Sequence, residues 1–99
     1  MTLLQINFDF DTNMMGSRLS ENGKPLAESL NREKGFISKI WTENPETGKA
    51  GGIHLFDNFE NASNFAINQH ERLLSIGAAN IDIQYFNVNQ PLSLINNGI

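Results

Sequence analysis

Six segments with a regular hydrophobic pattern follow one another along this chain, in the order strand, helix, strand, strand, helix, strand. The first segment, residues 3–10 (LLQINFDF), has apolar side chains at alternate positions, which is typical of a strand with one face on a hydrophobic core. The side chains expected on that face are Leu4, Ile6, Phe8 and Phe10. Because no basic segment precedes the apolar run, it is interpreted as a strand and not as a signal peptide.

The first helix and a β-hairpin follow a turn-rich segment. Leucines recur at helical spacing after Pro25, so the helix is expected to begin there, or near Ser17 with a kink at the proline. Gly35 is expected to end it. Residues 36–43 and 50–56 are rich in β-forming side chains, and the polar turn ENPETGK separates them, which predicts two strands.

The second half of the chain predicts one more helix and one more strand. Asp57 or Asn58 is a suitable N-cap, and Gly77 is a suitable residue to end the helix. The apolar stripe expected on this helix comprises Phe59, Ala62, Phe65, Ala66 and Leu73. Residues 81–88 form the fourth strand, and the tail QPLSLINNGI is expected to dock as a helical turn.

The resulting order, β-α-β-β-α-β, predicts an α+β protein with a ferredoxin-like fold. Right-handed crossovers convert this order into a four-stranded antiparallel sheet with both helices on one face. No linker or low-complexity segment interrupts the pattern, so residues 1–99 are expected to form a single domain.

Both faces of that sheet are expected to be partly apolar. In the second strand, Phe36 and Ile40 lie on one face, while Ile37 and Trp41 lie on the other. An exposed apolar face of this size requires a partner. We therefore expect a homodimer in which the open faces of two sheets pack together.

Composition excludes several classes of function. The chain has no cysteine, which excludes disulfides, thiolate metal sites and cysteine nucleophiles. A formal net charge of −4 leaves no basic stripe for nucleic acid or for an anionic membrane surface. No segment approaches the ~20 apolar residues of a membrane helix, so a cytoplasmic protein is expected. Motifs for phosphate loops, dinucleotides and calcium are absent from the sequence.

The hairpin KIWTENPETGKAGGIHLF holds the only tryptophan of the chain close to two glycines. We expect the turn to pair Glu43 with Lys49. Trp41 then lies opposite Gly51, where the indole packs flat on backbone, and Gly52 leaves space above the other face. Two interpretations stay open: a tightly packed hairpin, or the wall of a substrate cavity with Gly52 in its floor.

The only histidines, His54 and His70, are candidate general bases. A neutral imidazole near pH 7 is the usual general base, although each could instead be a hydrogen-bonded structural residue. With the expected turn, Ser38 lies opposite His54. The spacing of the histidines fits no metal motif, so no metal site is expected. Tyr85 lies on the fourth strand and needs a hydrogen-bond partner if its hydroxyl is buried.

Four stretches resemble the small bacterial YdhR-type monooxygenases. They are TLLQINFDF, KPLAESLNREKGFISKIWTE, AGGIHLF and FNVNQPLSLIN, so the resemblance covers nearly the whole chain. It implies a dimeric α/β barrel related to antibiotic-biosynthesis monooxygenases, and a role in the oxygenation of aromatic compounds.

Related cofactor-free monooxygenases deprotonate an anthrone-like or quinol-like phenolic substrate, whose electron-rich anion reduces O2 directly. The resemblance thus implies a dry aromatic pocket with one base and one or two hydrogen-bond donors, and no metal, flavin or other cofactor. The candidate catalytic residues are His54 and His70, and the candidate substrate-binding residues are Trp41, Tyr85, Asn7 and Gly52.

Two other functions stay open. Haem-degrading relatives use an Asn on the first strand, a Trp on a strand and an iron-binding His on the second helix, for which this chain offers Asn7, Trp41 and His70. The Trp of those relatives is on the third strand, whereas Trp41 is expected on the second. The other possibility is a non-catalytic dimeric module that binds a small molecule or acts in a stress response.

Overall fold

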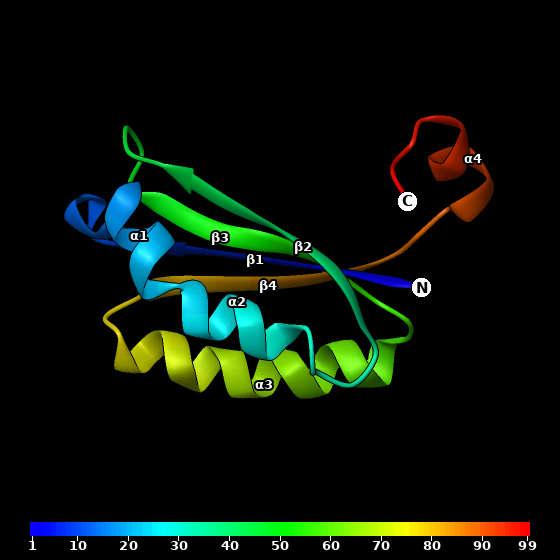
Figure 1. The fold of residues 1–99 in the computed structure, drawn as a ribbon, viewed down its shortest axis with the longest axis horizontal. Coiled ribbons are helices and arrows are strands. Elements are labelled where there is room, and N and C mark those ends of the chain that lie inside the picture. The colour runs from blue at the N-terminus through cyan, green and yellow to red at the C-terminus, as the bar shows by residue number, and fades with distance from the viewer.

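All the expected elements are present in the computed structural model, which describes residues 1–99 (Figure 1). The strands are β1 (Thr2–Asp9), β2 (Phe36–Asn44), β3 (Lys49–Phe56) and β4 (Ala79–Asn87). The helices are α1 (Ser17–Asn22), α2 (Lys24–Leu30), α3 (Phe59–Ser75) and α4 (Gln90–Ile95), with a short 3-10 helix, η1, at Thr12–Met14. The sheet is antiparallel with the order β2-β3-β1-β4, which confirms the ferredoxin-like α+β fold.

The hydrophobic core lies between the sheet and α3. β1 occupies the middle of the sheet, and its side chains alternate between buried and half-buried positions along the whole strand. Leu4 and Ile6 of β1 and Phe56 of β3 are almost fully buried on the face of the sheet that α3 covers, which we call the helix face. The ring of Phe65 on α3 packs against Phe56, with 5.5 Å between ring centroids.

The limits of α3 follow the expected capping residues. The side chain of Asn58 accepts a hydrogen bond from the backbone N–H of Asn61 at 2.8 Å, so Asn58 is the N-cap. Gly77 has a φ of 89°, as a residue that ends a helix often does. Phe59 does not join the buried stripe as expected: it is 57% exposed, and its ring packs edge-on against Tyr85 of β4.

The first helical region consists of two short helices rather than one. It begins at Ser17, the earlier of the two expected starts, and is interrupted at Gly23 instead of kinking at Pro25. Pro25 stands in the first turn of α2, where its missing N–H costs no hydrogen bond. A Cβ at Gly23 would lie 2.8 Å from the Leu19 carbonyl oxygen and 3.3 Å from the Trp41 ring, so the break lets the chain pass close over the indole.

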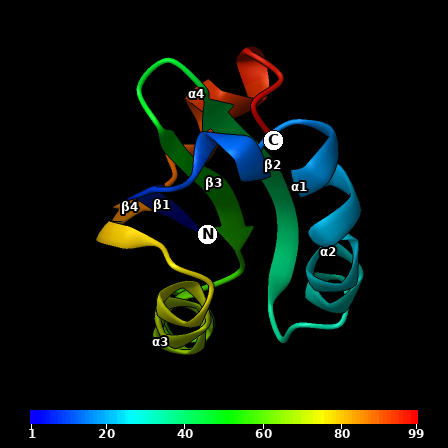
Figure 2. The ribbon, with the colours of Figure 1, turned by 90° about the vertical axis from the view of Figure 1, so that its left-hand side faces the viewer.

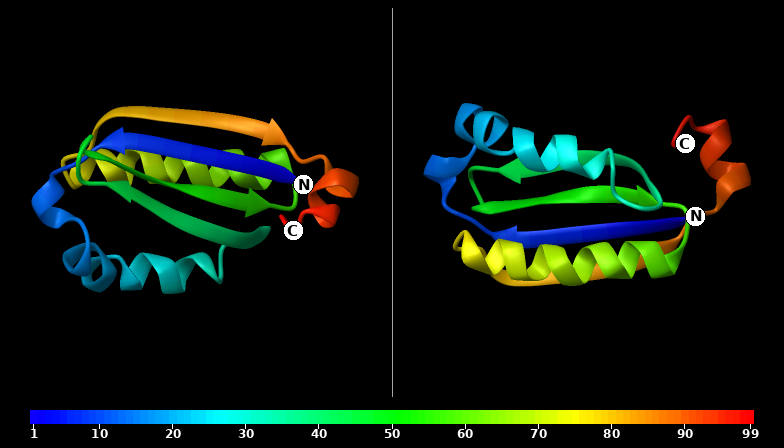
Figure 3. Two further views of the ribbon diagram at one scale, coloured as in Figure 1. Left: turned by 90° about the horizontal axis from the view of Figure 1, so that it is seen from above. Right: turned by 60° about the horizontal axis from the view of Figure 1, so that its bottom comes forward.

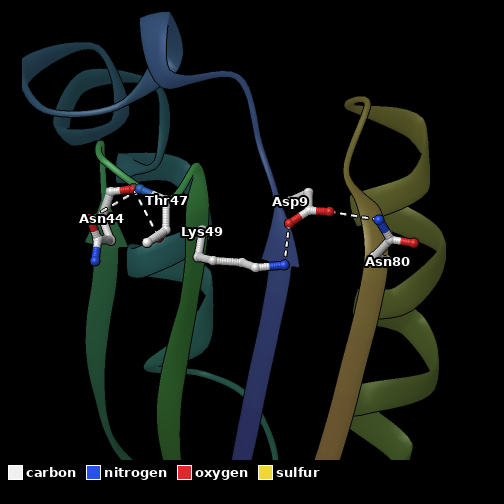
Figure 4. Close-up of polar contacts among 5 residues, drawn as sticks. All are labelled: Asp9, Asn44, Thr47, Lys49 and Asn80. Atoms are coloured by element: carbon white, nitrogen blue, oxygen red, sulfur yellow. Dashed lines mark hydrogen bonds and ion pairs between the residues drawn. The ribbon is translucent and has the colours of Figure 1, made fainter.

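A polar cluster fixes the sheet at the end where β1 finishes (Figure 4). The carboxylate of Asp9 forms an ion pair with Lys49 of β3 and accepts a hydrogen bond from the Asn80 side-chain amide of β4 at 2.6 Å. These contacts, with the Asn80 hydrogen bond the largest cause, lower the pKa of Asp9. The three neighbouring strands are therefore tied together at this end.

The opposite face of the sheet, here the open face, carries no helix of its own. Figure 2 shows α3 and α4 on opposite sides of the sheet, and both views of Figure 3 place α4 beyond the end of the strands. Apolar side chains on the open face and on α4 are exposed, among them Ile40 (65%) and Ile95 (74%). None of the helices has the combination of length and hydrophobicity that a transmembrane span requires.

Candidate functional site

A cavity of about 330 Å³ lies between the helix face of the sheet and the helices. The sheet contributes its floor, α1 and α2 cover one side, and α3 covers the other. Most of the lining is apolar, and its larger members are Ile6, Phe8, Phe10, Met14, Leu19, Leu26, Trp41, Leu73 and Ile76. An apolar concave site with a few polar groups is the usual form of a small-molecule site.

The register of the β2–β3 hairpin decides which side chains reach this cavity. Lys49 pairs with Asn44, not with Glu43, so the expected register was wrong by one residue. Trp41 consequently lies opposite Gly52, not Gly51. Residues that lie directly opposite each other in a strand pair have their side chains on the same face of the sheet. The observed register therefore places the indole and Gly52 on the same face, whereas the expected register placed them on opposite faces.

The turn itself explains this register. The Asn44 side chain accepts a hydrogen bond from the backbone N–H of Glu46 at 3.0 Å and another from that of Thr47 at 3.3 Å, the second of which is drawn in Figure 4. Asn44 thus extends β2 by one residue and closes the turn locally. Glu43 turns to the helix face, where its carboxylate accepts a hydrogen bond from the backbone N–H of Gly16 at 3.0 Å.

His54 lines the cavity, and one of its ring nitrogens is a buried acceptor without a hydrogen-bond partner. Its side chain is 1% exposed, and its Nδ1 lies 3.1 Å from the carbonyl oxygen of Leu4. A carbonyl can only accept, so Nδ1 carries the proton and Nε2 carries a lone pair. Nε2 is the only buried side-chain nitrogen or oxygen of the protein without a hydrogen-bond partner. Burial, and then the charge of Lys39, lowers the pKa of His54 to about 4, so the imidazole is neutral at pH 7.

Lys39 is the side chain opposite His54 in the sheet, where Ser38 was expected. Its ammonium lies 3.5 Å from the centre of the Trp41 ring, a cation–π contact. Burial, and then the nearby charge of Arg72, lowers the pKa of Lys39 to about 8. Lys39 was not among the candidate residues predicted from the sequence. Strand alternation places it on the same face as Trp41, but only the correct register brings it beside His54.

α3 adds two polar side chains to the cavity lining. Gln69 is 4% exposed, and its side-chain oxygen accepts a hydrogen bond from the guanidinium of Arg72 at 2.7 Å. Arg72 lines the cavity and is also exposed to solvent, so it stands at the entrance. Neither residue was among the sequence candidates.

The structure brings together three of the six candidate residues: His54, Trp41 and Gly52 all line the cavity. Trp41 also borders a groove between α1, α2 and β2, so its ring separates the cavity from that groove. The geometry thus combines the two interpretations of the hairpin, because both glycines are closely packed and Trp41 and Gly52 also line a cavity.

The other three candidates lie elsewhere. His70 and Tyr85 share a shallow depression between α3 and β4, outside the cavity. Burial raises the pKa of Tyr85. Asn7 is on the open face, paired in register with Gly51. Gln69 and His70 are consecutive on α3, and the phase of the helix aims the glutamine, not the histidine, into the cavity.

The residues proposed for haem do not form a haem site. Asn7 lies on the open face, Trp41 in the cavity, and His70 between α3 and β4. A haem could not contact all three, because the sheet separates Asn7 from the other two. No group of three or more histidine, aspartate and glutamate side chains is arranged to hold a metal ion.

Comparison with known proteins agrees with this fold. Residues 3–99 match the family described as "Putative mono-oxygenase ydhR". A crystal structure described as "a putative antibiotic biosynthesis monooxygenase from Deinococcus radiodurans" superimposes with a TM-score of 0.67 at 13% sequence identity. The match covers 90% of this chain and 93% of that one, and at this identity it shows a shared fold. No curated protein matches the chain.

Proposed function

The chain belongs to the ydhR mono-oxygenase family, and from this premise we propose that it oxygenates an aromatic, phenolic small molecule with O2 and without a cofactor. The observation that carries the proposal is the free Nε2 of His54, the one polar acceptor that the fold buries and leaves without a partner. His54 lines an apolar cavity whose volume, about 330 Å³, is within the range of small-molecule sites.

In the proposed mechanism, His54 receives the first proton. A phenolic or enolic O–H of the substrate donates a hydrogen bond to Nε2, and proton transfer produces an imidazolium and an electron-rich anion. The ammonium of Lys39 stabilises this anion, and the apolar lining excludes the water that would solvate it. Since the pKa of His54 is about 4, transfer depends on that stabilisation.

The anion then reduces O2, and the two resulting radicals combine in a carbon–oxygen bond. For a substrate with a reactive CH2 carbon, the peroxide O–O bond breaks, and one oxygen atom stays on carbon as a carbonyl. The other oxygen leaves as water with the two hydrogens of the CH2 group. The substrate supplies all the electrons, so the overall reaction balances without an external reductant.

Oxygen uptake tests this function. Anthrones, hydroquinones and tetracyclic phenols are supplied without cofactor, and consumption is compared with the spontaneous rate. We expect catalysed uptake with at least one class, and its loss in His54→Gln. His70→Gln is the matched control and should retain activity, because His70 lies outside the cavity. Uptake equal to the spontaneous rate for every substrate would refute the proposal.

The alternative is a non-catalytic binding module, and the low pKa of His54 favours it. A group with a pKa of about 4 is a good hydrogen-bond acceptor but a weak base towards a phenol. This alternative predicts saturable ligand binding that depends on His54, with no product and no oxygen consumed.

We also propose that two copies of the chain associate through their open faces and α4. Ile40 and Phe86 of the open face are 65% and 47% exposed, and α4 exposes Leu92, Leu94 and Ile95 to solvent. α4 stands away from the sheet and from the other helices (Figures 1 and 3), and these three side chains are 59–74% exposed. On the open face the charge of Asp9 is paired with that of Lys49, and Asp82, in register with Asn7, accepts a hydrogen bond from the Gln84 side chain.

A further inference from the structure

Two cations line the cavity, and neither has an acidic partner. Lys39 contacts the ring of Trp41, and Arg72 is hydrogen-bonded to the neutral amide of Gln69. No aspartate or glutamate belongs to the cavity lining. The two ion pairs of the protein, Lys24–Glu21 and Lys49–Asp9, use other residues.

This arrangement is unfavourable while the cavity holds no anion. Removing an ammonium from water costs free energy unless an opposite charge or hydrogen bonds replace the solvent. The positive charge of Arg72 adds repulsion, and both effects lower the pKa of Lys39. An anion between the two cations would offset both the desolvation of the Lys39 ammonium and its repulsion by Arg72. The groups that face Lys39 are Arg72 from α3 and His54 from β3.

The position of His54 adds a second requirement on the ligand. A Cβ at Gly52 would lie 2.6 Å from Cε of Lys39, 3.0 Å from Cε1 of His54 and 3.4 Å from its Nε2. The ends of the lysine and histidine side chains therefore converge above the same glycine. Nε2 accepts a hydrogen bond and the ammonium attracts an anion, so the ligand groups that they bind must lie close together.

We propose that the cavity binds an aromatic ligand with a hydroxyl group and a carboxylate on neighbouring ring carbons. The hydroxyl donates to Nε2 of His54, and the carboxylate lies between Lys39 and Arg72, while the ring packs on Trp41 and the apolar lining. This inference rests on the proposed function only in taking the cavity as the substrate site, and it names the substrate class.

Isothermal titration calorimetry with four naphthalenes tests it. The complete ligand is 1-hydroxy-2-naphthoate; 1-naphthol lacks the carboxylate, 2-naphthoate lacks the hydroxyl, and 6-hydroxy-2-naphthoate separates the two groups. We expect the complete ligand to bind at least roughly tenfold more tightly than each of the other three, as the gain of a charge-assisted hydrogen bond implies. Equal affinity for 1-naphthol and 1-hydroxy-2-naphthoate, or no binding of any of the four, would overturn the inference.

Variants at Lys39 test whether this residue binds the carboxylate of the ligand. Lys39→Met keeps the length and most of the volume of the side chain, and it should remove the advantage of 1-hydroxy-2-naphthoate while leaving affinity for 1-naphthol within about twofold. Lys39→Arg should restore most of the advantage. Lys34→Met, at an exposed lysine of the α2–β2 loop, is the control and should behave as wild type. A loss of affinity for both ligands in a folded Lys39→Met protein would contradict the assignment.

The outcomes separate this inference from the proposed oxygenation. If the hydroxy acid binds with the expected dependence on Lys39 but no oxygen is consumed, the substrate class stands and the oxygenation fails. If neutral hydroquinones are oxygenated but 1-hydroxy-2-naphthoate binds no more tightly than 1-naphthol, the proposed oxygenation stands and the proposed substrate class is refuted.

Discussion

Lys39 and His54 face each other across the β2–β3 pair, and their side-chain ends meet above Gly52. Burial, and then the charge of Lys39, lowers the pKa of His54, and the neutral imidazole gives the ammonium no opposite charge. The two groups therefore supply one positive charge and one lone pair to the same small part of an apolar cavity. The proposed chemistry and the proposed substrate class both depend on this pair.

The two adjacent glycines should respond differently to alanine. A Cβ at Gly52 meets the flexible end of Lys39, so Gly52→Ala should cost about 1 kcal/mol of stability or less but weaken ligand binding. A Cβ at Gly51 would lie 1.9 Å from the carbonyl oxygen of Ile6, so Gly51→Ala must move the backbone of β1 or β3 and should cost about 3 kcal/mol. Urea unfolding measures both. Equal losses of stability would show that Gly52 is a packing residue and not part of a binding site.

The pKa of His54 predicts how stability depends on pH. Because this pKa is about 4 in the folded protein and 6.5 in the unfolded chain, the unfolded state binds more protons between these values. Stability is therefore complete above pH 6.5 and falls as the pH decreases towards 4, by at most about 3 kcal/mol from this group. Denaturant titrations at several pH values measure the slope. His54→Gln should flatten it relative to wild type and to His70→Gln; the same slope in all three proteins would contradict the assignment.

Trp41 should act as a cavity wall more than as a core residue. Its side chain is half-buried and borders open space on both sides, so Trp41→Ala should cost about 2 kcal/mol, less than the 3–5 kcal/mol typical of a fully buried tryptophan. It should also abolish ligand binding, whereas Trp41→Phe should retain much of it. Unfolding curves and calorimetry report the two effects. If Trp41→Ala lost as much stability as a fully buried tryptophan and ligand binding were unchanged, the indole would be a packing residue alone.

Association through the open face can be tested with two matched isoleucines. Ile40 on the open face and Ile67 on α3 are 65% and 64% exposed, so neither is needed to fold one chain. We expect sedimentation of the wild-type protein to show a dimer, and Ile40→Arg to shift it towards monomer while Ile67→Arg does not. A wild-type protein that is monomeric at all concentrations would refute the proposed interface.

Most of the fold could be predicted from the sequence because its signals are local. The alternation of Leu4, Ile6 and Phe8, the cap at Asn58 and the glycine at position 77 each depend on neighbours within a few residues. Their order along the chain leaves few compact arrangements, and the observed sheet is one of them. The same stretches also identified the family correctly.

The candidate site could be predicted only in part, because its members come from separate elements. His54, Trp41 and Gly52 were recognisable as residues suited to a pocket, and they do line it. Lys39, Gln69 and Arg72 were missed, because nothing in the sequence distinguishes a lysine or an arginine at a cavity from one on an ordinary surface. His70 could not be excluded, because a single step along α3 separates a side chain aimed into the cavity from one outside it.

By itself, the sequence determined the elements, their order and hence the sheet, because hydrophobic period and capping are properties of consecutive residues. The register of the hairpin follows from the local hydrogen bonds of the Asn44 turn, but the resulting pairs of Trp41 with Gly52 and of Lys39 with His54 were identified only in the folded structure. Tertiary contacts decided the rest: the Leu4 carbonyl of β1 fixed the lone pair on Nε2 of His54, and burial removed part of the water around Lys39. These properties arise from desolvation and from neighbours distant in sequence, so they exist only once the chain has folded.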